Sequence, residues 1–284
     1  MTTHNTMSIE EFKERQQTVM LEGIVGEPVK VNYTDVGSGT PIILLHGIPT
    51  WSYLYQDTIQ ELEEDYRVIA PDLLGYGFSD QRDQFNRSLN IQADMVVKLM
   101  DELGLEKANV VAHDIGGGVG LILAHNEPER VNKLVLSNAV AYDSWPIHDM
   151  LVMGHPSRAN DSLEEIENFL TGAYKQMFFN KENLTETFLQ GIKAPYLHEE
   201  GKVSLVRNAA ALNTNETTAL TPTLSSIQQP VLLLWGEKDV WQPIETAEKL
   251  ENDLPNSTLV RVEASHWTPQ DAPEVFTAEI KKFI

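Results

Sequence analysis

The sequence contains no cysteine, few basic residues and no long apolar run, and each absence removes a class of function. Without cysteine there is no disulfide, thiolate metal site or cysteine nucleophile. Lysine and arginine number 21 against 42 aspartate and glutamate residues, so the net charge of −21 disfavours nucleic acid and anionic membranes as partners. No run approaches the roughly 20 apolar residues of a membrane span. The polar, acidic start lacks the apolar segment of a signal peptide, so the expected location is cytoplasmic.

What is present indicates an α/β protein. The 284 residues, 42% of them hydrophobic, suffice for one large or two small domains. Short apolar runs alternate with helical patterns, which is typical of a parallel sheet with helices on both faces. The expected parallel strands are Pro41–Leu45, Arg67–Ala70, Asn109–Ala112, Lys133–Leu136, Val231–Trp235 and Thr258–Val262. Val29–Thr34 alternates and ends at the turn residues Asp35 and Gly37, which predicts an antiparallel hairpin at the sheet edge. Helices are expected at Ile91–Leu103, Gly117–His125 and Pro273–Ile284.

One gap between strands is too long for a single crossover. About 95 residues separate Leu136 from Val231, whereas a helix with its loops needs about 25 to 35. The gap contains helical patterns at Ser162–Leu170, Leu184–Gly191 and Val203–Leu212. We therefore predict a core domain of residues 1–140 and 223–284, with a helical cap of residues 141–222 inserted into it.

The strongest local signal is a sharp turn between a strand and a helix. Residues 110–118 read VVAHDIGGG, which is the pattern of a nucleophile elbow with Asp114 where serine usually lies and Ala112 in place of the first glycine. Such an elbow would raise Asp114 above the carboxyl edge of the sheet. Aspartate before a helix more often caps it, so this motif alone leaves both roles open.

Three further features accompany Asp114. Asp239 follows one predicted strand and His266 follows the next, so the order Asp114, Asp239, His266 matches nucleophile, acid and base. Each lies just past a strand, where open α/β sheets place their sites. In such folds two backbone N–H groups form the oxyanion hole, here those of Ile48 and Ile115. The sequence therefore predicts a catalytic triad.

Other motifs point away from cofactors. His46 and His113 lie beside the predicted site and are interpreted as structural or site-shaping residues. No histidine pair has the spacing of a metal site, so no metal is expected. The glycine run Gly116–Gly120 does not fit the GxGxxG pattern of a dinucleotide site and belongs to the elbow. No cofactor is expected.

The sequence resembles the α/β-hydrolase superfamily, in its branch with an aspartate nucleophile. The resemblance rests on HGIPTWSYLY at His46–Tyr55, APDLLGYGFSD at Ala70–Asp80 and HDIGGG at the elbow. It covers roughly residues 27–140 and 225–284, and it is shared between haloalkane dehalogenases and epoxide hydrolases. It implies the α/β-hydrolase fold, a mostly parallel central sheet flanked by helices with an inserted helical cap. Some relatives carry the acid at the position of Asn138, which cannot ionise, and this favours Asp239.

The resemblance implies hydrolysis of a small apolar molecule through an ester on Asp114, but it leaves the leaving group open. Dehalogenases of this family usually hold the halide with a tryptophan after the nucleophile and a polar residue after HG, where this sequence has Ile115 and Ile48. Epoxide hydrolases need phenols that protonate the opening alkoxide. The candidate pocket residues for these roles are Trp51, Trp145, Tyr142, Tyr174 and Tyr196. Dehalogenase activity leads, with epoxide hydrolysis as the alternative.

Hypotheses from other classes remain beside these two. A catalytically idle binding protein of the same fold would have lost the triad, whereas all three residues are present here. A cofactor-independent oxygenase would show oxygen uptake. A serine-type esterase is disfavoured because position 114 is aspartate, and attack by a carboxylate on an acyl carbon would give only an anhydride. The sequence does not indicate an oligomeric state.

Overall fold

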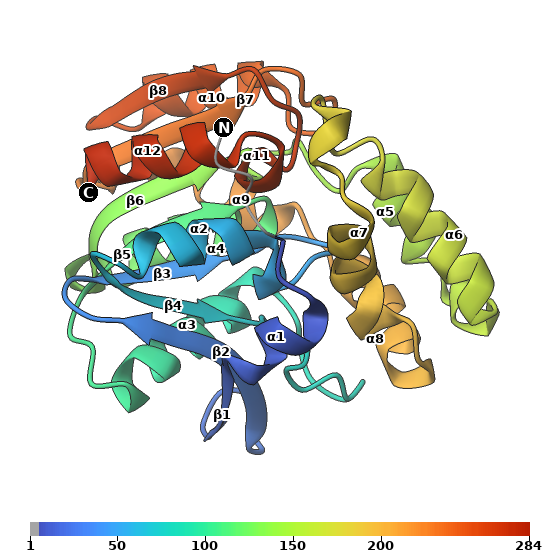
Figure 1. The fold of residues 1–284 in the computed structure, drawn as a ribbon. Helices are drawn as coiled ribbons and strands as arrows, with labels where there is room; N and C mark the ends of the chain where they lie inside the picture. The colour runs from blue at the N-terminus through green and yellow to red at the C-terminus, as the bar shows by residue number, and fades with distance from the viewer. Residues whose placement is uncertain (1–5) are drawn as a thin grey trace.

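The computed structural model describes residues 6–284, and its centre is a sheet of eight strands (Figure 1). Along the sheet the order is β1-β2-β4-β3-β5-β6-β7-β8. β2 is antiparallel to both of its neighbours, and the remaining pairs are parallel. The strands are β1 (Gln16–Leu21), β2 (Val29–Gly37), β3 (Pro41–Leu45), β4 (Arg67–Pro71), β5 (Ala108–His113), β6 (Val131–Ser137), β7 (Val231–Gly236) and β8 (Ser257–Val262).

The six predicted parallel strands and the antiparallel β2 are confirmed, with small extensions at their ends. The apolar runs of β5 and β7 are buried at every residue, as expected for central strands covered on both faces. β1 was not predicted. Its residues QQTVML are mostly polar or partly exposed, because it forms the outermost strand beside β2. The hairpin at the edge is made by β1 and β2, and the turn expected at Asp35 and Gly37 is wrong, because β2 continues to Gly37 and these residues pair with β4.

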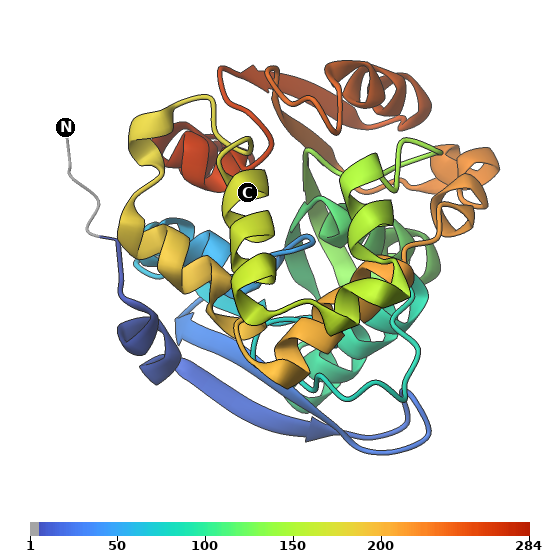
Figure 2. The same ribbon diagram turned by 90° about the vertical axis from the view of Figure 1, so that its right-hand side faces the viewer.

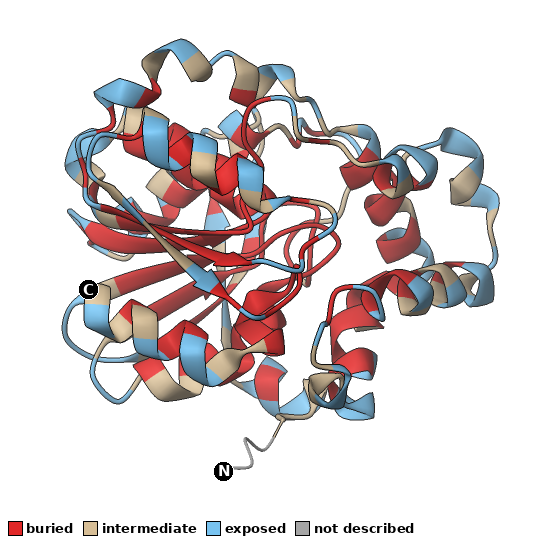
Figure 3. Cartoon of the chain, turned by 90° about the horizontal axis from the view of Figure 1, so that it is seen from above, coloured by how far each residue is buried: buried red, intermediate tan, exposed pale blue. Residues whose placement is uncertain are grey.

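Helices cover both faces of the sheet. α2 (Gln56–Leu62) contacts α12 (Pro273–Phe283), and α3 (Leu89–Glu102) contacts α4 (Ile115–Asn126). Figure 2 shows the first pair on one side of the sheet and the second pair on the other. The buried residues gather between these layers in the sheet and on the inner helix faces (Figure 3). The other helices of this part are α1 (Ile9–Glu14), α10 (Ile244–Asp253) and α11 (Thr268–Asp271).

The long insertion between β6 and β7 is helical. Its helices are α5 (His148–Met153), α6 (Leu163–Tyr174), α7 (Glu186–Lys193), α8 (Glu199–Ala210) and α9 (Asn215–Thr218), and α5 to α8 lie beyond one end of the sheet (Figure 1). Hydrogen bonds join them to the loop after β3: the Tyr174 hydroxyl donates to the Pro49 carbonyl oxygen at 2.7 Å, and the Tyr196 hydroxyl to that of Thr50 at 2.8 Å. The cap boundaries, at 141 and 222, stay a prediction.

Within residues 6–284, no helix combines the length and the apolar character that crossing a membrane requires.

Candidate active site

Asp114 lies at the turn between β5 and α4, with a strained backbone. Its φ of 53° and ψ of −121° are rare for a residue with a side chain. Its side chain makes no capping hydrogen bond to α4, so the common structural role of an aspartate at this position does not apply. Gly116 permits the turn, because a Cβ there would collide with the carbonyl oxygens of Leu45 and His46 at the end of β3.

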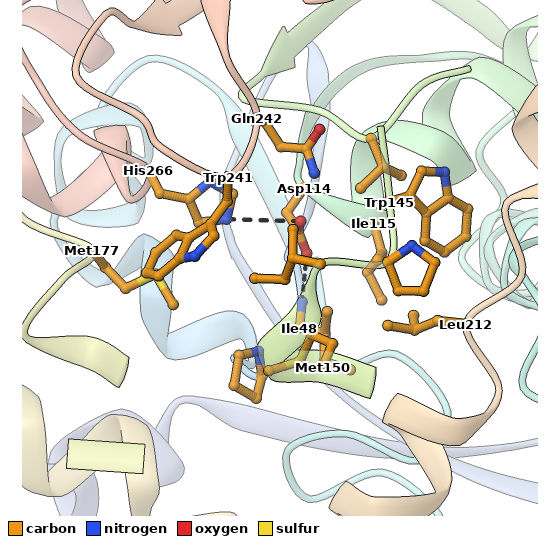
Figure 4. Close-up of a pocket in the computed structure, with 14 residues that line it drawn as sticks. Ile48, Asp114, Ile115, Trp145, Met150, Met177, Leu212, Trp241, Gln242 and His266 are labelled. Carbon is orange, nitrogen blue, oxygen red and sulfur yellow. Dashed lines mark hydrogen bonds and ion pairs between the residues drawn. The ribbon is translucent and has the colours of Figure 1, made fainter. Parts of the chain in front are cut away.

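The two carboxylate oxygens of Asp114 have different neighbours (Figure 4). The backbone N–H of Ile48 donates to Oδ1 at 2.8 Å, and His266 Nε2 lies 3.7 Å from Oδ2. Gly47 is needed for this approach, because a side chain there would collide with Asp114. One oxygen is therefore held by the loop after β3, and the other faces a histidine.

His266 is oriented by Asp239. Its Nδ1 lies 2.7 Å from Asp239 Oδ2. Nδ1 therefore carries a proton, and Nε2 is the ring nitrogen that faces Asp114. Asn138 Nδ2 donates to the same Asp239 oxygen at 2.7 Å. The other oxygen accepts the backbone N–H groups of Trp241 and Gln242 at 2.8 and 3.1 Å. This buried carboxylate accepts four hydrogen bonds, which fix its direction and that of the imidazole.

Burial and charge set the protonation of the Asp114–His266 pair. Burial raises the pKa of Asp114, and His266 and the N–H groups of Ile48 and Ile115 offset part of that rise. Burial lowers the pKa of His266, but Asp239 and then Asp114 outweigh it, so this pKa lies above its ordinary value. Each partner therefore stabilises the charged form of the other.

A narrow cavity opens above Asp114. The volume that the centre of a water-sized molecule can occupy inside it is about 30 Å³. Its lining is largely aliphatic or aromatic, and its side-chain polar groups come from few residues. The lining residues are Ile48, Pro49, Asp114, Ile115, Val140, Trp145, Pro146, Ile147, Met150, Met177, Leu212, Trp241, Gln242 and His266. Such a lining suits a small apolar molecule held against one reactive carboxylate.

The family model described as "alpha/beta hydrolase fold" matches residues 40–273 of this chain. The chain belongs to the α/β-hydrolase fold family.

Similar proteins in this family have several activities. Haloalkane dehalogenase 2 of Mycobacterium tuberculosis is 30% identical over 267 residues, which cover 88% of this chain and 90% of that protein. Epoxide hydrolase 1 of Caenorhabditis elegans is 28% identical over 314 residues, covering 98% of this chain and 74% of the relative. A crystal structure of an α/β-hydrolase fold protein from Burkholderia ambifaria superposes with a TM-score of 0.84 at 24% identity, and the match covers 98% of both chains. The last similarity concerns the fold alone.

The structure brings together five of the residues that the sequence singled out for catalysis in this hydrolase. Asp114 faces His266, and His266 in turn is hydrogen-bonded to Asp239. The backbone N–H of Ile48 donates to the Asp114 carboxylate. The N–H of Ile115 also lowers the pKa of that carboxylate. Trp145 lines the cavity, although its indole N–H is used on Thr217 Oγ1 at 2.7 Å.

Four predicted pocket residues do not line the cavity, and for them the prediction needs correction. The hydroxyls of Tyr174 and Tyr196 are committed to the backbone carbonyls described above. Tyr142 donates to Asp253 Oδ2 at 2.7 Å, and Trp51 Nε1 donates to the Gly191 carbonyl at 3.2 Å. These aromatic side chains are buried. Their polar atoms therefore join the cap to the core and anchor surrounding loops.

Sequence reasoning missed most of the cavity wall. Trp241 and Gln242 follow Asp239 by two and three residues, so their position next to a predicted triad member was an available signal. Met150, Met177 and Leu212 come from the cap and the loops flanking its helices, and no motif marks them. Their side chains meet only because the cap folds over the sheet edge.

The other two histidines near the site are kept neutral. Burial lowers the pKa of His46 to about 4, and its Nε2 accepts the Leu73 N–H at 3.0 Å. Burial also lowers the pKa of His113 well below its ordinary value, and His113 lies beneath His266 with ring centroids 4.8 Å apart. In the described part of the chain, no group of three or more histidine, aspartate or glutamate side chains is placed to hold a metal ion.

Proposed function

We propose that this hydrolase uses Asp114 to displace a leaving group from an sp³ carbon and then hydrolyses the resulting ester. The observation that carries the proposal is the position of the Asp114 carboxylate in the elbow. Its Oδ1 accepts a hydrogen bond from the Ile48 N–H, and its Oδ2 faces His266 Nε2. A serine in this position would serve acyl transfer. A carboxylate instead suits an alkyl carbon, because the product is an ester that water can open.

In the first step, a lone pair of Asp114 Oδ2 forms a bond to the substrate carbon, and the leaving group departs with its bonding electrons. In the second step, His266 Nε2 takes a proton from water, and the oxygen of this water attacks Asp114 Cγ. The N–H groups of Ile48 and Ile115 stabilise the charge that develops on Oδ1. The Cγ–Oδ2 bond then breaks, and the alcohol leaves with Oδ2 and the proton from His266. The second proton of the water remains on the new carboxyl group and is lost to solvent, which restores the Asp114 carboxylate. Asp239 holds the imidazole and its positive charge throughout.

The substrate class proposed first is a small haloalkane. The apolar, narrow cavity and the similarity to haloalkane dehalogenase 2 support it. Epoxide hydrolysis is the second candidate, because an epoxide hydrolase matches almost the whole chain. That candidate needs an acid to protonate the opening alkoxide, and no tyrosine is among the lining residues. The cavity therefore favours a leaving group that needs no proton.

The origin of the oxygen in the product alcohol tests the two-step route. With enzyme in excess over a bromoalkane in H₂¹⁸O, the first turnover should release alcohol containing ¹⁶O, because that oxygen is Asp114 Oδ2. The peptide containing Asp114 should gain one ¹⁸O atom, measured by mass spectrometry. Alcohol labelled with ¹⁸O in the first turnover would mean that water attacks the substrate directly, which contradicts the proposal.

The pH dependence should differ between the two steps. In the free enzyme, Asp239 and Asp114 hold the pKa of His266 above its ordinary value despite burial. Alkylation converts Asp114 to a neutral ester, so the pKa of His266 should fall in the alkyl-enzyme. Only neutral His266 accepts a proton from water, so hydrolysis of the ester should speed up as pH rises through this lower pKa and then level off. NMR titration of His266 in the free protein and rapid-quench kinetics of ester breakdown measure both values; equal values would contradict the argument.

Removing the carboxylate at position 239, and then placing one at position 138, tests the role of Asp239. Asp239→Asn should slow ester hydrolysis by about 10³- to 10⁴-fold, because His266 loses the charge that orients and stabilises its protonated form. The Asn138 side chain already lies 2.7 Å from Asp239 Oδ2. Adding Asn138→Asp to the Asp239→Asn protein should therefore recover part of the rate. A double variant no faster than the single one, with both folded, would argue against this placement of the charge.

A further inference from the structure

Gln242 is a buried residue whose side-chain nitrogen has no protein partner in the described part of the chain. Its side chain is 2% exposed and lines the cavity. Its backbone is fixed on both sides, because its N–H donates to Asp239 Oδ1 at 3.1 Å and its carbonyl accepts the Trp235 indole N–H at 2.8 Å. Its Oε1 lies 2.7 Å from Ser144 Oγ, whose single proton also has the Ala141 carbonyl oxygen as an acceptor at 2.9 Å. Among residues 6–284, nothing accepts a hydrogen bond from its Nε2.

The free nitrogen is turned toward the reaction centre. Figure 4 shows the Gln242 amide above Asp114, with its nitrogen on the side of the carboxylate. Charge favours this orientation, because turning the amide over would place Oε1, an acceptor, beside the Asp114 carboxylate. Because this nitrogen has no acceptor in the described part of the protein and borders the cavity, a ligand bound there can accept its hydrogen bond.

The other potential donors of the cavity are occupied or differently placed. Ile48 and Ile115 have no side-chain donor, and their N–H groups serve the Asp114 carboxylate. The Trp145 indole N–H is used on Thr217. Trp241 also lines the cavity, but it is only partly buried. Among the buried residues that line the cavity in the described part of the chain, Gln242 is thus the one whose side chain offers an unpartnered, uncharged N–H donor.

Building on the proposed function, we propose that Gln242 Nε2–H is the donor that stabilises the leaving group as it departs. As Asp114 Oδ2 forms its bond to carbon, the carbon–halogen bond breaks and both of its electrons go to the halogen. The halide then accepts a hydrogen bond from the amide, and no proton changes place. In a cavity lined mainly by apolar side chains, this hydrogen bond replaces the solvation that water would give the anion.

The nature of this donor also restricts the substrate. A side-chain amide does not give up its proton at any physiological pH, so it can bind an anion but cannot turn an alkoxide into an alcohol. A halide leaves as a stable anion and needs no proton, whereas an opening epoxide does. Gln242 therefore directs the site toward carbon–halogen bonds.

The test isolates the first step. In the His266→Gln protein the ester should accumulate on Asp114, so its rate of formation is measured by rapid quench and intact mass. Chloro-, bromo- and iodoalkanes of one chain length are compared with and without Gln242→Met. We expect about 10- to 100-fold slower ester formation from the chloroalkane, as for loss of a hydrogen bond to a charged group. The iodoalkane should be affected least, because its charge is the most diffuse. Bromide should also inhibit the Gln242→Met protein more weakly.

Two further variants keep the test sharp. Gln190→Met makes the same change at an exposed residue of α7 and should leave ester formation unaltered. Gln242→Glu keeps the size of the side chain but replaces the donor by a carboxylate, so it should slow the chloroalkane at least as much as Gln242→Met. Equal slowing for all three halides, or normal ester formation with slow hydrolysis, would overturn the assignment. Absence of any ester while Gln242 is intact would instead overturn the proposed function, and this assignment with it.

Discussion

The Asp114→Asn protein should lose turnover by about 10⁶-fold while remaining folded. Removing the nucleophile from hydrolytic triads has effects of this size. A neutral amide is a far weaker nucleophile than a carboxylate, so neither an ester nor released leaving group should be detected. The measurement is kcat with a bromoalkane and, for the His266→Gln, Asp114→Asn double variant, intact mass after incubation. An adduct on the double variant would show that another residue attacks the substrate.

The same substitution should raise thermal stability. Burial raises the pKa of Asp114 in the folded protein, so keeping this carboxylate ionised at neutral pH opposes folding, and the penalty fades as pH falls through the raised value. Asparagine removes the charge and keeps almost the same size and shape. We expect a higher melting temperature at pH 7, by about 2–4 °C for each kcal/mol relieved. The gain should shrink in acid, and an unchanged gain there would contradict this explanation.

Intact mass is the necessary control for both measurements. The site is arranged to add water to a carbonyl carbon at position 114, so the introduced asparagine could itself be hydrolysed back to aspartate. That conversion adds about one dalton and would restore activity slowly. Freshly purified protein should be inactive, and activity that grows in step with the mass change would identify His266 and water as its cause.

Much of the fold could be predicted because the central strands are buried along their whole length. β5 contains the apolar run Val110–Ala112 and β7 the run Val231–Trp235, and every residue of both strands is buried. β1 could not be predicted in this way, because an edge strand has a half-exposed, polar sequence. α10 was missed for a similar reason: its sequence IETAEKLEND is mostly charged or polar and buries only three residues.

In the candidate site, too, one part could be predicted from the sequence and another could not. Asp114, Asp239 and His266 each follow a strand, and the ends of parallel strands meet at one edge of the sheet. The pocket walls depend instead on where side chains of the cap point. Tyr174 was a sensible candidate acid, yet its hydroxyl donates to the Pro49 carbonyl and supports the loop that carries Ile48. Neither the composition nor the residue spacing of the sequence indicates where the Tyr174 hydroxyl points.

The His266→Gln protein should form the ester on Asp114 and fail to hydrolyse it. Glutamine has no basic nitrogen to accept a proton from water, so the second step should slow by a factor approaching the roughly 10⁶ seen when the base of a hydrolytic triad is removed. The first step needs only the carboxylate of Asp114, which remains. Its pKa should be somewhat higher without His266, whose charge lowers it, so the reaction is best run above neutral pH.

The mass of the trapped protein then distinguishes the two substrate classes. After exposure to mixed small bromoalkanes and epoxides, a gain equal to the alkyl group, with bromide released, would identify a dehalogenase. A gain equal to a whole epoxide would identify an epoxide hydrolase, and it would require an acid other than the tyrosines that the structure places outside the cavity. No adduct from either set, in a protein shown to be folded, would contradict the aspartate-nucleophile mechanism for these substrates. Peptide mapping to Asp114 completes the test, because an adduct elsewhere would be adventitious alkylation.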